Sequence, residues 1–147
     1  ILSGRRINDG MPAFIAKRLI QMLIQKGKSP QNAKVLVKGM TFKEDVSDIR
    51  NSKVVDLINE LMDYSVNVHV IDVNASPNEV AHEYKLTLID KPSSDYDAVI
   101  VAVGHEAYKG LSEQDFAGLM AEDAVLMDLK SLYINLKDST KFSYWSL

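Results

Sequence analysis

Cysteine is missing from this chain of 147 residues. Its absence excludes disulfide bonds, thiolate metal sites and a cysteine nucleophile within the chain. It also fits a reducing compartment, and we expect a cytoplasmic location. No apolar run approaches the roughly 18 residues that a membrane-spanning helix needs, and no signal peptide is evident. We therefore expect no membrane partner.

An excess of positive charge is also missing, because the formal net charge is −3. General binding to nucleic acid or to an anionic membrane surface would require a basic excess, so we expect no nucleic-acid partner. The chain has three histidines, and no two of them have the spacing of metal ligands. We therefore expect no metal site.

The glycine-rich fingerprint of dinucleotide-binding folds is the third absence. None of the seven glycines belongs to a G-x-G-x-x-G string. Asp72 ends an apolar segment, where a dinucleotide-binding fold places its ribose-binding acid. Without the fingerprint, the better interpretation of Asp72 is a turn or helix-capping residue.

The hydrophobic pattern that is present alternates between two periods. Spacings of three and four predict helices over residues 9–26, 53–64 and 105–121, with a short helix inside 74–85. Apolar β-rich runs predict strands over 33–40, 66–73, 86–90, 97–104 and 124–130, and the tail 141–147 could add an edge strand. The alternation predicts an α/β fold, a three-layer Rossmann-like parallel sheet with helices on both faces.

The helix at residues 9–26 comes before this alternating region. Asp9 is its predicted N-cap, and Pro12 would then lie in the permissive first turn. Its apolar stripe fits packing against a core or an interface better than a cofactor site.

Open parallel sheets bind ligands beyond the carboxyl ends of their strands, near the point where strand order reverses. In this sequence those ends are expected at residues 39–43, 72–74, 104–108 and 128–131. His105 follows the most apolar strand and could face such a site. We therefore expect these four stretches to meet in space.

Residues 38–52, "KGMTFKEDVSDIRNS", are the richest of these stretches. Gly39 would let a ligand approach the backbone, and Lys43 offers a mobile cation suited to phosphate. The helix that begins near Ser52 directs free N–H groups to the same region, and Lys130 could add a second cation. An anion such as a nucleotide is the ligand that this pattern favours.

A simpler interpretation of the same stretch is a solvated loop. In that case Asp45, Asp48 and Arg50 would pair locally and contribute little free energy. Lys38 is a further oddity, because it interrupts a run expected to be buried. It would either extend its ammonium group past the strand end or mark an edge of the sheet.

Several strings of the sequence together resemble the UDP-glucose/GDP-mannose dehydrogenase family. They are "GRRIND" (4–9), "GMTFKEDVSDIRNSKVVDLINEL" (39–61), "VHVIDV" (68–73), "YDAVIVAVGH" (96–105), "MDLKSLY" (127–133) and "YWSL" (144–147). More narrowly, they resemble the branch that acts on UDP-N-acetylhexosamines such as the mannosamine and galactosamine derivatives. Those enzymes make uronic acids for bacterial surface polysaccharides, including capsules.

The resemblance implies a division of the chain. Family members have an N-terminal NAD-binding domain, a central helical dimerisation segment and a C-terminal Rossmann-like domain that binds UDP. Residues 1–30 would be the end of the central segment, and residues 31–147 the UDP-sugar-binding domain. The full-length protein would be an NAD-dependent 6-dehydrogenase and a homodimer. Because the family's glycine fingerprint and catalytic cysteine lie in the other parts, this chain alone should be inactive.

The resemblance also implies roles for individual residues. Phe42 and Lys43 match a Phe-Lys pair that contacts the nucleotide half of the substrate. Lys130 matches a basic residue that also holds the substrate, and Arg50 matches an arginine that reaches NAD from this side of the cleft. Asp45 and Asp48 would then shape the loop without touching ligand.

The chain departs from the family pattern at three positions. Ser131 stands where glycine usually follows the D-x-K element, which is formed here by residues 128–130. Val73 stands where proline is common, and Lys38 stands where an apolar residue is common. Ser131 bears on the backbone geometry beside Lys130.

Two other interpretations come from different classes of protein. A receiver-like or nucleotide-sensing regulatory module would use Asp72 and Lys130 at strand ends without a catalytic role. An assembly role would use helix 9–26 as a dimer seam with an exposed apolar stripe.

Overall fold

The computed structural model describes the backbone from Leu2 to Leu147 and the side chains from Gly10 onward. The α-helices are α1 (Leu2–Gln25), α2 (Lys53–Asp63), α3 (Pro77–Tyr84) and α4 (Glu113–Ala117). Short 3-10 helices are η1 (Pro30–Asn32), η2 (Glu106–Tyr108) and η3 (Ile134–Leu136). The strands are β1 (Lys34–Lys38), β2 (Asn67–Ile71), β3 (Tyr96–Val101), β4 (Met120–Asp128) and β5 (Ser143–Ser146).

The five strands form one sheet in which every pairing is parallel. Their order is β2-β1-β3-β4-β5, so the chain moves outward from β1 to β2 and then crosses back to β3. The strand order therefore reverses between β1 and β3. In sheets of this kind the carboxyl ends beside that reversal are where ligands bind.

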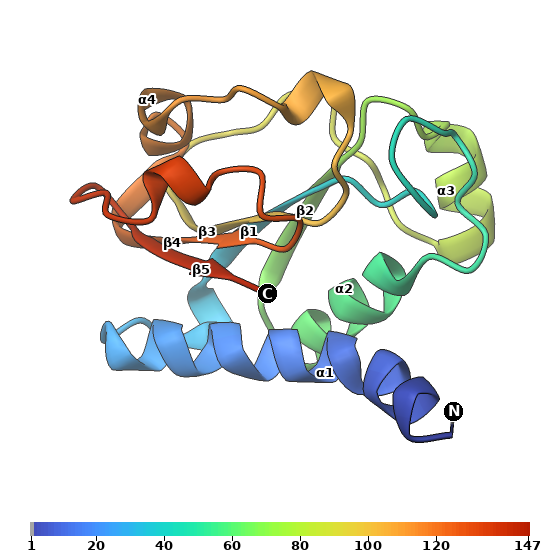
Figure 1. The fold of residues 1–147 in the computed structure, drawn as a ribbon, viewed down its shortest axis with the longest axis horizontal. Coiled ribbons are helices and arrows are strands. Elements are labelled where there is room, and N and C mark those ends of the chain that lie inside the picture. Colours follow the sequence, from blue (N-terminus) through green and yellow to red (C-terminus); the bar gives the residue numbers. More distant parts are fainter. Residues whose placement is uncertain (1) are drawn as a thin grey trace.

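The sheet separates two hydrophobic cores. On one face α1 and α2 cover a core that includes Leu19, Val37 and Ile100. On the other face α4, η2 and η3 cover a core that includes Leu36 and Phe116. Figure 1 shows the sheet edge-on, with α1 and α2 below it and α4 above it. The predicted three-layer parallel α/β fold is confirmed.

Helix α1 is longer than the sequence pattern predicted. It begins at Leu2, so Asp9 lies inside it and the predicted N-cap is wrong. Pro12 is also inside the helix, where its ring removes one main-chain hydrogen bond. The side chain of Asp9, like the whole "GRRIND" string, lies outside the described side chains.

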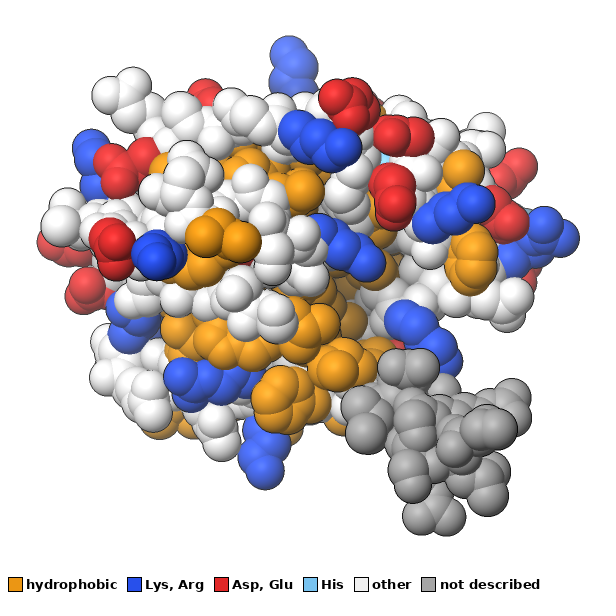
Figure 2. Space-filling view, viewed as in Figure 1, with side chains coloured by type: hydrophobic (Ala, Val, Ile, Leu, Met, Phe, Trp, Pro, Cys, Tyr) orange, Lys and Arg blue, Asp and Glu red, His pale blue; other side chains and the backbone are white. Residues whose placement is uncertain are grey.

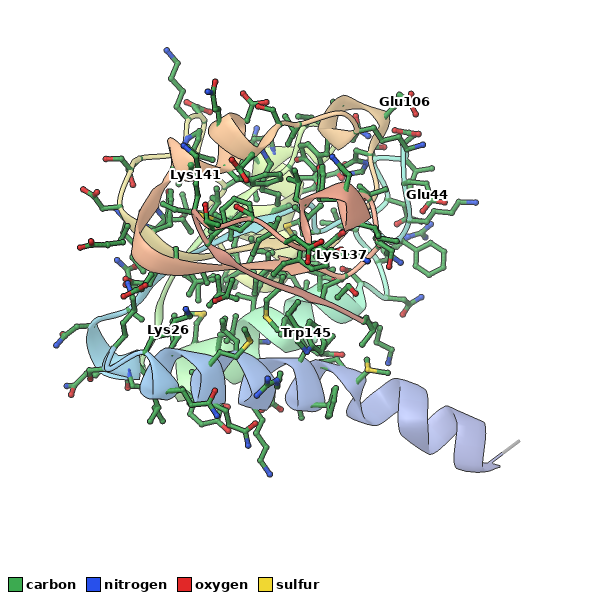
Figure 3. The ribbon with its side chains drawn as sticks, turned by 60° about the vertical axis from the view of Figure 1, so that its left-hand side comes forward. Lys26, Glu44, Glu106, Lys137, Lys141 and Trp145 are labelled. Carbon is green, nitrogen blue, oxygen red and sulfur yellow. The ribbon has the colours of Figure 1, made fainter. Side chains whose placement is uncertain are left out.

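The apolar stripe of α1 faces the sheet and α2 rather than solvent. Ile15, Leu19 and Leu23 are buried, whereas Phe14 and Ile24 stay exposed. The ring of Phe14 lies 6.4 Å from that of Trp145, and Figure 3 shows Trp145 on the side of β5 that faces α1. None of the helices in the described part of the chain has the length and apolar character that a membrane crossing requires.

Two predicted elements are wrong. Residues 86–90 make a single parallel bridge, between Val70 and Leu88, and no strand. The chain leaves α3 through Lys85, which adopts a left-handed conformation (φ 58°), and only Leu88 of the following segment pairs with β2.

The predicted helix over 105–121 is broken into η2 and α4. Gly110 adopts a positive φ of 79° that interrupts any continuous helix. Ser112 and Asp115 then form a capping box that starts α4, and β4 begins only three residues after α4 ends. Phe116 is nevertheless fully buried, as its place in the apolar pattern predicted. The tail does add an edge strand, β5.

Candidate functional site

Gly39 lies where the loop after β1 packs against the loop after β3. Its φ is 95°, and a Cβ at this position would lie 2.7 Å from the Cβ of Val103. Its N–H donates to the carbonyl of Ile71, 2.8 Å away. Only glycine can adopt this φ without strain and also leave room for the side chain of Val103. The two loops therefore start from one tightly packed point at the reversal of strand order.

The loop after Gly39 presents two side chains to solvent. The N–H of Phe42 donates to the carbonyl of Asp48 at 2.7 Å, and the hydroxyl of Thr41 donates to the carbonyl of Lys43 at 2.8 Å. These bonds fold the loop back on itself, which leaves the Phe42 side chain 55% exposed and Lys43 exposed. An exposed aromatic ring beside a free ammonium group can serve a ligand that combines a flat ring with negative charge.

Asp72 ends the neighbouring strand and turns its carboxylate inward. It accepts from the N–H of Met40 (2.7 Å), Asn74 (2.7 Å) and Ala75 (2.9 Å), and from Nε2 of His105 (3.0 Å). Burial alone would raise the pKa of Asp72, but these hydrogen bonds together hold its pKa below the usual value. The interpretation of Asp72 as a turn residue is confirmed. His105 is fully buried and joins this network, so it does not face the site.

Asp128 holds the last loop of the site in the same way. Its buried carboxylate accepts from the N–H of Leu132 (2.9 Å) and Tyr133 (2.7 Å) and from the hydroxyl of Tyr144 (2.5 Å). Burial, and then the contact with Asp128, raise the pKa of Tyr144 to about 12. The loop so fixed carries Lys130 outward into solvent.

Phe42, Lys43 and Lys130 converge on one pocket of about 420 Å³. Figure 2 shows a hollow on this face of the molecule, with hydrophobic side chains in it and basic side chains at its margin. The other lining residues come from α1, from α2 and its approach, and from the strand ends: Met11, Pro12, Ile15, Thr41, Glu44, Asn51, Lys53, Val54, Leu57, Ala102, Val103, Leu129 and Leu147. Its size, its apolar walls and its few convergent cations are typical of a small-molecule site.

Arg50 does not line this pocket, although its neighbours Asn51 and Lys53 do. It lines a different pocket, of about 560 Å³, together with Glu83 and Tyr84. Its guanidinium group pairs with Asp48 at 3.0 Å, and its side chain is 80% exposed. Hydrogen bonds from Arg50 hold the pKa of Asp48 below its usual value. The prediction that Asp48 pairs locally is therefore confirmed.

The structure also explains Lys38. Strand β1 lies between β2 and β3, so Lys38 does not mark a sheet edge and that alternative is wrong. Its ammonium group extends past the strand to lie 4.9 Å from the centre of the Tyr108 ring. Burial lowers the pKa of Lys38, and the charge of Asp115 opposes this effect.

Sequence reasoning did not assign two parts of the site. The pocket wall from α1, at Met11, Pro12 and Ile15, carries no signal beyond a general apolar stripe. Asp128 was recognisable only as the first residue of the D-x-K string. Among the residues that the structure describes, no group of three or more acidic or histidine side chains could hold a metal ion.

Comparison with known proteins decides the family. Residues 36–135 match the UDP-binding domain of the UDP-glucose/GDP-mannose dehydrogenase family. The chain belongs to this family. The matched range runs from the middle of β1 to η3, and so includes every loop of the site described above.

Two curated relatives are similar at the level of sequence. The UDP-N-acetyl-D-glucosamine 6-dehydrogenase of Salmonella typhi is 41% identical over 131 residues, which are 88% of this chain and 31% of the relative. Protein CapL of Staphylococcus aureus is 41% identical over 133 residues, which are 90% of this chain and 31% of the relative. The chain therefore spans about a third of the length of the relatives that it matches.

A solved structure supports the fold. The NDP-N-acetyl-D-galactosaminuronic acid dehydrogenase of Methanosarcina mazei Go1 superposes with a TM-score of 0.87 at 23% identity. The superposition covers 99% of this chain and 30% of that protein. At this identity the likeness concerns the fold alone.

The tight contact at Gly39 gives a testable prediction. Gly39→Ala should lower the free energy of unfolding by about 2–4 kcal/mol, because it adds both left-handed strain and an overlap with Val103. Gly110→Ala is the matched control, since its φ is also positive (79°) but nothing lies within 4 Å of its Cβ. The free energy of unfolding of that control should fall by only about 1 kcal/mol. Urea denaturation of both variants measures the difference, and equal losses would contradict a close-contact role for Gly39.

Ser131, which replaces the usual glycine, gives a second prediction. Its φ is 54°, a conformation that a serine adopts at a cost and glycine adopts freely. Ser131→Gly should raise the free energy of unfolding by about 0.5 kcal/mol. Ser29→Gly, at an ordinary φ of −79°, should instead lower it by a similar amount. Thermal denaturation compares the two variants. A lower stability in both would show that the backbone of Ser131 is not strained.

Proposed function

We propose that this chain is the UDP-sugar-binding part of an NAD-dependent dehydrogenase that oxidises C6 of a UDP-N-acetylhexosamine to a carboxylate. The observation that carries the proposal is the convergence of Phe42, Lys43 and Lys130 on one pocket at the reversal of strand order. Membership of the family and the name of the Salmonella typhi relative, a UDP-N-acetyl-D-glucosamine 6-dehydrogenase, support the substrate class.

The charges and walls of the pocket suit a nucleoside diphosphate. Lys43 and Lys130 would bind the diphosphate through charge-assisted hydrogen bonds, which are stronger than neutral ones. The Phe42 ring and the apolar residues of α1 and α2 offer surface for the base and ribose. Binding energy gained on the UDP moiety would then hold C6 of the sugar against reacting groups on another part of the full-length protein.

The cofactor side of the proposal rests on Arg50. NAD, when bound to the full-length protein, would supply the hydride acceptor for this oxidation. The chain has no glycine fingerprint, so we assign most of the NAD site to the N-terminal domain of the same protein. Arg50 fits a supporting contact, because it is exposed and lines a different pocket from the one assigned to UDP. This chain alone should therefore not oxidise a sugar.

The domain arrangement is part of the proposal. Residues 1–30 would belong to the central segment, and residues 31–147 to the UDP-binding domain. A homodimer of the full-length protein would cover Phe14 and Ile24, which are exposed on α1 here. The lack of cysteine in this chain fits a reducing cytoplasm. The role in surface-polysaccharide or capsule synthesis rests on the resemblance to the family branch that acts on UDP-N-acetylhexosamines.

The receiver-like alternative is less well supported. A receiver needs an accessible carboxylate that can accept a phosphoryl group. The side chain of Asp72 is fully buried, and its carboxylate already accepts four hydrogen bonds. A group committed in this way is a poor nucleophile.

Replacing Lys43 tests the nucleotide role. Lys43→Ala should weaken binding of UDP to the 147-residue chain about tenfold, because one charge-assisted contact of about 1.5 kcal/mol is lost. Titration calorimetry measures the affinity, with Lys137→Ala as the control because Lys137 is exposed and lies outside the pocket. In the intact enzyme the affinity for NAD should stay unchanged. An unaltered UDP affinity in Lys43→Ala would remove this role.

Replacing Arg50 tests the cofactor role. Arg50→Ala in the intact enzyme should raise the KM for NAD several-fold while the affinity for UDP stays within twofold of the parent value. Arg50→Lys keeps the positive charge and should recover part of the loss. Steady-state kinetics at saturating UDP-sugar provides the measurement. Normal NAD kinetics in Arg50→Ala would show that Arg50 has only the local pairing with Asp48.

A further inference from the structure

Two reciprocal hydrogen bonds join the loop after β1 to the loop after β3, and we call them the Asp45 clasp. The N–H of Asp45 donates to Nδ1 of His105 at 2.9 Å. In return, the N–H of Glu106 donates to Oδ1 of Asp45 at 2.8 Å. Figure 3 shows the neighbouring residues Glu44 and Glu106 at the same end of the molecule. The clasp ties an otherwise exposed loop to the end of a central strand.

The clasp fixes the tautomer of His105. A main-chain N–H can only donate, so Nδ1 must carry a lone pair and the ring proton must sit on Nε2. That Nε2–H points at Oδ2 of Asp72, 3.0 Å away. The hydroxyl of Thr41 lies 3.3 Å from Nε2 and gives its own proton to the carbonyl of Lys43. The buried carboxylate of Asp72 thus orients the imidazole, whose Nδ1 receives the N–H of Asp45 and also lies 3.0 Å from Nδ2 of Asn74.

These contacts bracket the two residues proposed to meet UDP. On one side the N–H of Met40 is bound to Asp72, and on the other side the N–H of Asp45 is bound to His105. Between them the carbonyl of Lys43 is bound to Thr41. Phe42 and Lys43 therefore stand on a short backbone segment that is fixed at both ends, although their side chains are exposed.

We propose that His105 is a positioning residue for the nucleotide: its Nδ1 holds Asp45 and thereby keeps Phe42 and Lys43 in the conformation that binds UDP. The inference rests on the proposed function. Asp45 adopts a left-handed backbone (φ 61°), which is costly for a residue other than glycine and persists only where surrounding contacts impose it. Without the clasp the loop would populate other conformations. The apparent affinity for UDP would then fall in proportion to the population of the conformation that binds UDP.

Two amide replacements test the roles of the two imidazole nitrogens of His105 separately. His105→Gln keeps a donor near the position of Nε2, so Asp72 stays paired, but it lacks the acceptor at Nδ1. His105→Asn keeps an acceptor near Nδ1 and leaves buried Asp72 without that partner. His105→Gln should therefore be the more stable variant and the weaker UDP binder, by about threefold to tenfold relative to His105→Asn. A merely structural role would instead rank affinity and stability in the same order.

Variants at Asp45 test the clasp without disturbing the core. Asp45→Gly keeps the left-handed backbone and removes the carboxylate that receives the N–H of Glu106, whereas Asp45→Asn keeps an acceptor oxygen. Asp45→Gly should weaken UDP binding about threefold, and Asp45→Asn should bind like the parent chain. Melting temperatures check that both variants stay folded.

The readouts distinguish failure of the inference from failure of the proposed function. Nitrogen NMR of His105 should show Nδ1 unprotonated, and the Asp45 amide should exchange faster in His105→Gln than in the parent, both without UDP. Slow exchange of that amide in His105→Gln, or UDP affinity equal to that of the parent chain, overturns the positioning role. A parent chain that does not bind UDP in calorimetry overturns the proposed function of this chain instead.

Discussion

The parallel pairing of β1 with β3 is the constraint on which the rest of the molecule depends. Because β2 lies outside β1, and β4 and β5 lie outside β3, the chain must leave this pair in opposite directions. The loops after β1 and β3 therefore start side by side, and Gly39 must pack directly against Val103. A pocket at this point follows from the topology, before any side chain of the loops is chosen.

Two buried carboxylates turn that topology into a defined surface. Asp72 and Asp128 stand at the ends of β2 and β4, and each satisfies the main-chain N–H groups of the loop beside it. Such groups would otherwise lack partners where loops cross the end of a sheet. Acids shape the backbone, while the lysines on the loops stay available for a ligand. This division explains why a chain of net negative charge can present a basic pocket.

The sequence was informative where a residue had few physical alternatives. The apolar run over residues 97–104 predicted a buried strand, and β3 (Tyr96–Val101) covers most of it. Gly39 was expected to let a ligand approach the backbone, whereas in the structure Val103 occupies the space beside it. The sequence was misleading where local pattern and tertiary context disagreed. The apolar positions around Phe116 looked like one helix, but Gly110 and the cap at Ser112 divide it. The pairing of His105 with Asp45 had no sequence signal, because it joins residues 60 positions apart. Pattern could place His105 near the site but could not show that it is buried.

The single bridge between Val70 and Leu88 has a consequence for how the molecule behaves in a crowded solution. An exposed outer strand offers a row of free N–H and C=O groups, onto which a strand of another molecule can add. Here the N–H of Ile89 already donates to the carbonyl of Val70, so the middle of β2 is covered. At the opposite border β5 has only four residues. One border of the sheet is thus partly covered and the other is short, and both features disfavour the addition of a strand from another molecule.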